Sequence, residues 1–237
     1  MSDATTISVN FAKPVPLFPL DSVTLLPQQV LPLHIFEPRY RQMVEHVLDG
    51  SGQIAMAVFR GERWKQEYHG RPPLRPCVCI GQIIQHERLA DGRYNLLLQG
   101  VCRAKILEES PPSAERLFRE AMLEPLSTPH AEETTPELDS MRRSVGRMLI
   151  DGPLTHFAAA EAVAEYADDE DVPTNAFFEL IAFTLISDPE VRYRLLAEAD
   201  ALRRVGVVQD ELKRLESLLR RAERQHPEQW PKGCSWN

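Results

Sequence analysis

The hydrophobic pattern of the chain changes once, near residue 125, and no other feature constrains the fold as strongly. Before this point, short apolar runs alternate with turn residues, as in β-strands; after it, apolar residues recur at spacings of three and four, as in helices. Strands followed by helices indicate an α+β fold. We therefore predict a β-rich unit over residues 13–125, a helical bundle over 136–222 and a flexible tail over 223–237.

Four strand-like segments make up most of the first half. The segment Ala90-Asp91-Gly92-Arg93 joins two of them, and Asp-Gly at its centre is a strong hairpin signal because both residues tolerate positive φ. We therefore predict that residues 77–89 and 94–108 pair as antiparallel strands. The four segments are VPLFPLDSVTLLP, QIAMAVF, CVCIGQIIQHERL and RYNLLLQGVCRAKILEE.

The stretch LPLHIFEPRYRQMVEHVL, residues 31–48, joins a strand directly to a helix. Its apolar residues alternate up to Ile35 and then take helical spacing from Tyr40 onward, with Pro38 suited to the first helical turn. His34 and Glu37 could form a general base with its orienting carboxylate. Because no nucleophile or oxyanion donor set accompanies them, we predict a structural role for this joint.

The second half begins after a Pro/Thr/Glu-rich linker between about Pro125 and Pro136, which we expect to be exposed. Asp188 followed by Pro189 and Glu190 is typical of a helix start. The last helix carries a heptad-like apolar seam, suited to packing within the bundle or, alternatively, to a homodimer. The seam consists of Val205, Val208, Leu212, Leu215, Leu219 and Ala222.

Composition narrows the cellular context and the partners. The net charge of −8 arises wholly after residue 125, because residues 1–125 carry 14 basic and 14 acidic side chains. A strongly basic nucleic-acid surface is therefore not expected. No apolar run indicates a signal peptide or a membrane span, so we predict a cytoplasmic protein without membrane contact. The four cysteines are too few for a disulfide framework, and we predict reduced thiols.

Metal sites are not predicted either. Cys77 and Cys79 share one face of a strand and Cys102 lies on the partner strand, but structural zinc sites normally use knuckles with two to four intervening residues. The acidic run between Glu165 and Asp171 lacks the ligand spacing and the central glycine of a calcium loop. We read the run as a solvated helix end or loop.

Four segments resemble the N-terminal substrate-binding domain of the Lon protease family. They are VPLFPLDSVTLLPQQVLPLHIFEPRYRQMV, IAMAVF, IGQIIQHERLADGRYNLLLQGVCRAKI and FFELIAFTLISDPEVRYRLLAEADALRRVGVVQDEL. The resemblance implies a PUA-like β-barrel with one inserted helix, then a helical bundle, in a region that recruits substrate. The chain contains no Gly-X₄-Gly-Lys-Ser/Thr phosphate loop and no assignable Ser-Lys pair. We therefore expect a free-standing recognition domain without enzymatic activity or cofactor.

The predicted recognition surface is the 17-residue loop from Arg60 to Pro76, which is long for a connection between strands. Its candidate peptide-binding residues are Phe59, Arg63, Trp64, Lys65 and Tyr68. Aromatic and cationic side chains anchor protein partners, and they also stack bases and neutralise phosphates. The favoured function is a non-catalytic module for unfolded or extended polypeptides, such as an adaptor or quality-control factor. RNA binding is the alternative, and Trp64 and Tyr68 could instead cover the core.

Overall fold

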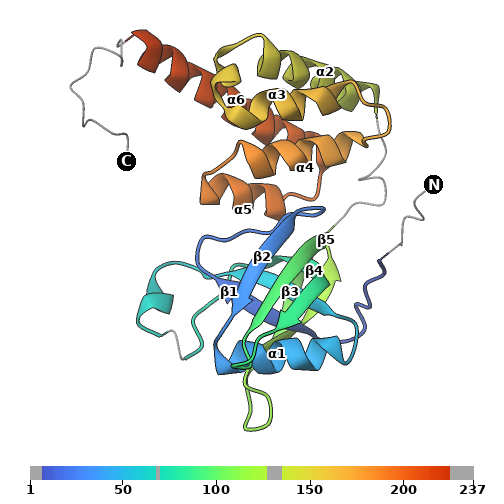
Figure 1. Ribbon diagram of the computed structural model, residues 1–237, viewed down its shortest axis with the longest axis vertical. Helices are drawn as coiled ribbons and strands as arrows, with labels where there is room; N and C mark the ends of the chain where they lie inside the picture. The colour runs from blue at the N-terminus through green and yellow to red at the C-terminus, as the bar shows by residue number, and fades with distance from the viewer. Residues whose placement is uncertain (1–6, 68–69, 127–134, 225–237) are drawn as a thin grey trace. The chain divides into compact units, whose positions relative to one another are not determined.

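A computed structural model describes residues 7–67, 70–126 and 135–224 (Figure 1). Tyr68, most of the predicted linker and nearly all of the predicted tail lie outside these residues, so the expectations about them remain predictions. Within the described ranges, the helices are all too short or too polar to cross a membrane. The chain forms two compact units: β1–β6 with α1 and α5, and α2, α3, α4 with α6.

The first unit is built on one mixed, six-stranded sheet that closes on itself. The strand order is β2-β5-β4-β3-β1-β6, and an additional β5–β6 pairing closes the ring. Only the β1–β3 pair is parallel. The predicted α+β class is confirmed. The strands are β1 Val15–Leu20, β2 Val30–Ile35, β3 Gln53–Val58, β4 Cys77–Arg88, β5 Tyr94–Ser110 and β6 Arg119–Pro125.

The predicted hairpin is confirmed, since β4 and β5 pair antiparallel from Cys77↔Lys105 to Arg88↔Tyr94. Gly92 adopts φ 79° at its turn, and the Asp91 side chain accepts a hydrogen bond from the Arg93 backbone at 3.1 Å. Farther along β5, a Cβ at Gly100 would collide with the Leu26 carbonyl oxygen. Glycine therefore permits the close crossing of β5 and the segment that leads into β2.

The barrel core consists of side chains from the inner faces of its strands. β3 is buried along its whole length, as expected for a strand in the middle of a closed sheet. A connected cluster of buried apolar residues fills the ring. Its members are Val15, Leu17, Ala55, Ala57, Phe59, Leu74, Val78, Ile80, Ala104, Ala121 and Leu123.

Helix α1, Pro38–Leu48, follows β2 after two residues, as predicted from the change in period. Its buried face consists of Tyr40, Met43, Val44 and Val47. Tyr40 meets Phe18 of β1 edge to face, with ring centroids 4.6 Å apart. The joint thus fixes one helix against the barrel.

Over the residues that the structure describes, the second unit is a bundle of four α-helices. Thr135 caps α2 by accepting a hydrogen bond from the Leu138 backbone at 3.2 Å. Burial along α6 is complete at Val205, Val208 and Leu212 but partial beyond them. The helices are α2 Pro136–Ile150, α3 Ala158–Ala164, α4 Thr174–Thr184 and α6 Ala201–Arg224; η2 Pro153–His156 and η3 Glu165–Ala167 are short 3-10 turns.

One buried arginine organises the acidic segment of this bundle. Arg142 of α2 donates hydrogen bonds to the backbone carbonyls of Tyr166, Ala167, Asp169 and Val172, at 2.5 to 2.7 Å. The guanidinium also lies 5.2 Å from the ring centre of Phe177. The acidic run is therefore a loop whose carbonyls converge on a single cation.

Helix α5, Pro189–Ala197, falls within the range predicted for the bundle but packs with the barrel unit. Asp188 caps it as predicted, accepting from the Glu190 and Val191 amides. Tyr193 Oη accepts a hydrogen bond from the Cys77 amide at 2.9 Å. Arg75 pairs with Glu190 through two contacts of 2.7 and 3.0 Å. These polar contacts with β4 explain why α5 groups with the strands.

Candidate functional site: two surfaces of the barrel unit

Of the candidate aromatic residues that the structure describes, Phe59 and Trp64 lie against the core. Phe59 is buried and forms an isolated bridge with Leu74. The Trp64 ring, in the short 3-10 turn η1 (Arg63–Lys65), stacks on Phe59 with centroids 5.6 Å apart and planes 9° apart. Trp64 also packs against the core cluster. These contacts favour a covering role for Trp64, and its role in binding stays a prediction.

The cations of the same loop have local partners. Arg63 bonds to Glu67 at 2.7 Å, and Lys65 pairs with Glu62. Arg75 pairs with Glu190 and lies 3.8 Å from the ring centre of Tyr193. The loop is therefore less positive than its sequence suggests, because acidic neighbours offset these three charges.

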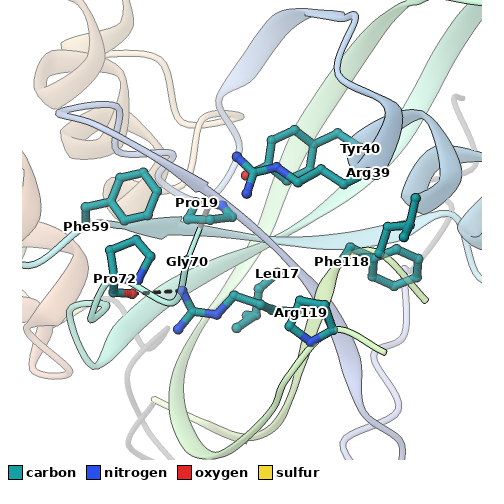
Figure 2. Close-up of a pocket in the computed structure, with 11 residues that line it drawn as sticks. Leu17, Pro19, Arg39, Tyr40, Phe59, Gly70, Pro72, Phe118 and Arg119 are labelled. Carbon is teal, nitrogen blue, oxygen red and sulfur yellow. Dashed lines mark hydrogen bonds between the residues drawn. The ribbon is translucent and has the colours of Figure 1, made fainter. Parts of the chain in front are cut away.

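A small pocket lies beside this loop (Figure 2). Its volume is about 160 Å³, and residues Phe59, Gly70 and Pro72 bring the loop to its wall. Arg119, which is buried, donates to the Pro72 carbonyl at 2.9 Å and pairs with Glu109. Ligand pockets usually measure about 300–1,000 Å³. This pocket is therefore large enough for one side chain at most.

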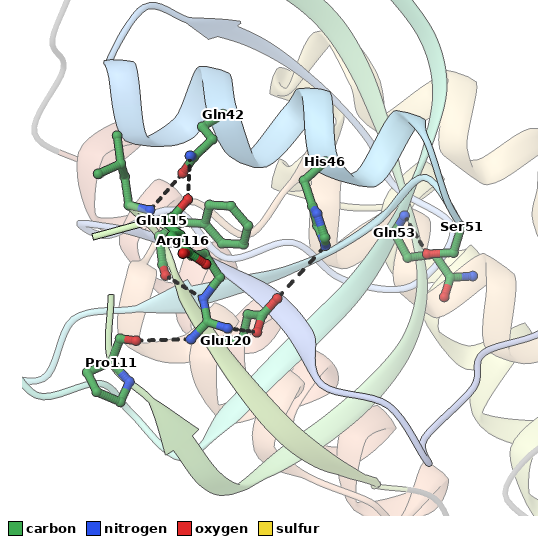
Figure 3. Close-up of polar contacts among 10 residues, drawn as sticks. Gln42, His46, Ser51, Gln53, Pro111, Glu115, Arg116 and Glu120 are labelled. Atoms are coloured by element: carbon green, nitrogen blue, oxygen red, sulfur yellow. Dashed lines mark hydrogen bonds and ion pairs between the residues drawn. The ribbon is translucent and has the colours of Figure 1, made fainter. Parts of the chain in front are cut away.

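The opposite wall of the pocket comes from the β5–β6 connection, which is held to α1 (Figure 3). The Gln42 amide donates to the Glu115 carbonyl at 2.9 Å and accepts from the Leu117 backbone at 2.7 Å. Arg116 pairs with the buried carboxylate of Glu120 and donates to the Pro111 carbonyl at 3.0 Å. This connection is thus a fixed wall.

A second surface, which the sequence interpretation missed, lies on the outer face of β2. We define the β2 face as the outward side chains of Val30, Pro32, His34 and Phe36, together with Leu97 opposite Pro32 on β5. Val30 is 38% exposed and Phe36 is 61% exposed. The Phe36 ring stacks near His34, with centroids 6.3 Å apart. The face is therefore largely apolar and open.

A groove of about 380 Å³ runs along this face. It is lined by residues 32–34 of β2, 85–87 of β4 and 95–97 of β5. β2 and β4 flank β5 in the sheet, so β5 lies between the other two segments. The groove volume falls within the usual range for ligand pockets, and three neighbouring strands contribute to its lining.

The polar side of the groove is a chain of hydrogen bonds. Arg93 Nη1 lies 3.4 Å from His34 Nε2, and His34 Nδ1 lies 2.7 Å from Asn95 Oδ1. Asn95 Nδ2 donates to Glu87 at 3.3 Å. Because Arg93 can only donate, His34 accepts at Nε2 and donates from Nδ1. His34 is therefore bonded within the sheet, while Glu37 pairs with Arg39 at 3.0 Å, in agreement with a structural joint.

The signal for this surface was present in the sequence. In a half-buried strand the outward positions are normally polar, yet positions 30, 32 and 36 around β2 are Val, Pro and Phe. The alternation of Leu31, Leu33 and Ile35 identified the strand correctly. The apolar residues at the outward positions 30, 32 and 36 were the sign of an exposed apolar surface.

Two cysteines of the barrel unit, Cys77 and Cys102, are poorly suited to nucleophilic chemistry. Burial raises the pKa of the Cys102 thiol to about 11 and also raises the pKa of Cys77. Both thiols therefore remain protonated and weakly nucleophilic near neutral pH. In the part of the chain that the structure describes, no three His, Cys, Asp or Glu side chains gather as a metal site.

The fold defines a class of protein: an α+β domain with a ring-like mixed sheet and a helical bundle. Two solved structures share this fold. The N-terminal domain of the Mycobacterium avium complex Lon protease matches with a TM-score of 0.64 at 21% identity, covering 85% of this chain and 98% of that chain. A Lon N-terminal domain protein from Xanthomonas campestris matches with a TM-score of 0.57 at 20% identity, covering 84% and 98%.

The chain belongs to the ATP-dependent protease La (LON) substrate-binding domain family, whose profile matches residues 14–214. A Lon protease of Desulfosudis oleivorans is 22% identical over 200 residues, covering 84% of this chain and 23% of that protein. Lon protease 2 of Syntrophobacter fumaroxidans is 26% identical over 125 residues, covering 53% and 15%. The matched stretches thus span less than a quarter of these relatives.

Proposed function

We propose that this chain is a non-catalytic module that binds unfolded or extended polypeptide on the β2 face, and that it acts as an adaptor or quality-control factor. The observation that carries the proposal is the exposed apolar row of β2 beside a groove of about 380 Å³. Exposed apolar residues gathered on one face are typical of an interaction site. Membership of a substrate-binding domain family supports the same function.

Phe36 is the expected anchor of this site. It is the most exposed large apolar side chain of the described residues, and aromatic anchors often dominate a binding interface. The smaller pocket beside the 60–76 loop is a second place for a side chain, and Trp64, Arg63 and Lys65 remain candidates there. The local ion pairs of that loop favour a polypeptide partner over RNA, since they reduce its attraction for phosphates.

The test is a binding titration with a labelled, permanently unfolded protein, followed by fluorescence anisotropy. Phe36→Ser should weaken binding by at least about 10-fold, which corresponds to roughly 1.4 kcal/mol. Ile150→Ser on α2 is the matched control, because Ile150 is also exposed, at 55%, but lies in the helical unit. Equal affinities for wild type and both variants would remove the β2 face from the proposal.

We also propose that the distal part of α6 supports a homodimer. Leu215, Leu219 and Ala222 are only partly buried within one chain, and Leu218 beside them is exposed. A second copy of the helix would cover this seam. Sedimentation velocity should then show a dimer that Leu215→Glu with Leu219→Glu converts to a monomer, whereas a monomeric wild type at high concentration would contradict the proposal.

A further inference from the structure

The free edge of β2 indicates how the proposed polypeptide would bind. β2 is the terminal strand of the sheet order and pairs only with β5 among the described residues. A strand at the edge of a sheet presents backbone donors and acceptors that match another extended chain. The orientation of each backbone group in β2 therefore decides what this edge can bind.

The hydrogen bonds at the start of β2 set that orientation. The Gly100 amide donates to the Gln29 carbonyl at 2.8 Å, so Gln29 turns its carbonyl toward β5. Backbone direction alternates along a strand, and the register pairs Leu31 with Leu98 and Leu33 with Leu96. The odd-numbered residues of β2 therefore face β5, while Val30, Pro32 and His34 turn their backbone groups to the open edge.

Pro32 fits this assignment. Proline lacks an amide hydrogen and occurs in sheets where its nitrogen faces solvent. The open edge thus offers the amides of Val30 and His34 and the carbonyls of Val30, Pro32 and His34. Buried backbone groups are nearly always hydrogen-bonded. We therefore expect those amides and carbonyls of the open edge that have no partner among the described residues to be exposed to water. One proline reduces unspecific pairing at this edge without blocking it.

Charge narrows the class of partner. Glu87, in the groove beside β2, has no ion-pair partner among the described residues, whereas its neighbours Arg88 and Arg93 pair with Glu45 and Asp91. The carboxylate of Glu87 favours a positively charged partner, because complementary charge attracts the partner and orients it.

We propose that an extended polypeptide segment with net positive charge adds to the sheet as a strand along the free edge of β2, with its alternate apolar side chains on the β2 face. This inference rests on the proposed function and specifies its binding mode. Main-chain hydrogen bonds would supply affinity for many sequences, while Phe36 and Leu97 would select apolar side chains at every second position.

The first experiment uses a nine-residue peptide with alternating Val and Lys. N-methylation of the amides that face β2 should weaken binding by at least about 10-fold, because each methyl group removes a donor and blocks close approach. N-methylation of the opposite set should change affinity less than about 3-fold. With Val on the β2 face, the Val amides face β2 in antiparallel addition and the Lys amides face it in parallel addition, so a clear difference between the two sets in either direction supports strand addition. Equal effects of the two sets would overturn strand addition.

The second experiment changes the protein. Val30→Pro removes an edge amide at a position where proline is tolerated, and Val30→Ala shortens the side chain but keeps the amide. Val30→Pro should bind at least about 10-fold more weakly than Val30→Ala at equal thermal stability. If the two variants bind alike while Phe36→Ser still weakens binding, strand addition fails and the proposed function survives. If wild type binds no polypeptide, both fail.

Glu87 is tested separately. A peptide in which Glu replaces Lys should bind wild type at least about 5-fold more weakly than the Lys peptide, and Glu87→Gln should narrow this preference. Raising the salt concentration should also narrow it, since exposed charges are screened. Equal binding of the two peptides to wild type at low salt would overturn the charge selection.

Discussion

Arg142→Ala should be among the most destabilising single changes in the helical unit. The guanidinium is buried and serves four backbone carbonyls as well as the Thr174 hydroxyl at 3.3 Å. Each hydrogen bond from a charged donor contributes about 1.5–3 kcal/mol net. Water can replace part of this set at the exposed loop, so we expect a loss of about 3–4 kcal/mol in the free energy of unfolding.

Urea unfolding followed by circular dichroism at 222 nm measures this loss directly. Arg143→Ala is the matched control, because Arg143 is exposed on the same helix and should change stability by less than about 0.5 kcal/mol. Arg142→Lys should fall between the two, since an ammonium cannot reach all the carbonyls that the planar fork serves. If Arg142→Ala is within about 1 kcal/mol of the control, convergence on Arg142 does not stabilise the loop.

Three further changes test other parts of the structure. Burial raises the pKa of Tyr193 to about 12, so the stability that its neutral form provides is present below about pH 10 and lost as pH rises toward 12. Tyr193→Phe, which loses the bond to the Cys77 amide, should be about 1 kcal/mol less stable than wild type at pH 8. This deficit in the free energy of unfolding should disappear near pH 11.5, and a difference that stays constant with pH would contradict the raised pKa of Tyr193. Trp64→Ala should lower the free energy of unfolding by about 2 kcal/mol, roughly half the value for a fully buried tryptophan. An unchanged melting temperature together with lost polypeptide binding would instead support the loop as the recognition surface. Cys77 and Cys102 should react with a thiol reagent at pH 8 much more slowly in the native than in the urea-unfolded protein, as mass spectrometry of labelled peptides can show; equal rates would mean that these thiols are accessible.

Short sequence motifs correctly predicted the turns, caps and joints that depend on only a few neighbouring residues. The Asp91-Gly92 hairpin, the strand-to-helix joint at Pro38 and the cap at Asp188 follow from backbone preferences of a few neighbouring residues. The change in hydrophobic pattern near residue 125 predicted the α+β class, and the family resemblance added the barrel with one inserted helix. Hydrophobic spacing likewise identified the buried side of α1.

Features that depend on contacts between residues far apart in sequence were not predicted. α5 has an ordinary helical pattern, and contacts with residues about a hundred positions earlier, such as Arg75, Cys77 and Arg103, place it with the barrel. Arg75 of the 60–76 loop looked available because its partner Glu190 is remote in sequence. The β2 face was not predicted, because the alternation of inward apolar residues identifies a strand but does not show whether the outward Val30 and Phe36 form a surface.

The most direct test of polypeptide binding on the β2 face is hydrogen exchange with and without a saturating unfolded polypeptide. The binding account predicts slower exchange in segments covering residues 30–36 and 94–99, with little change in residues 60–67 and in the helical unit. Phe36→Ser should abolish that protection at the same polypeptide concentration. Protection confined to residues 60–67 or 111–118, with residues 30–36 unchanged, would contradict the account.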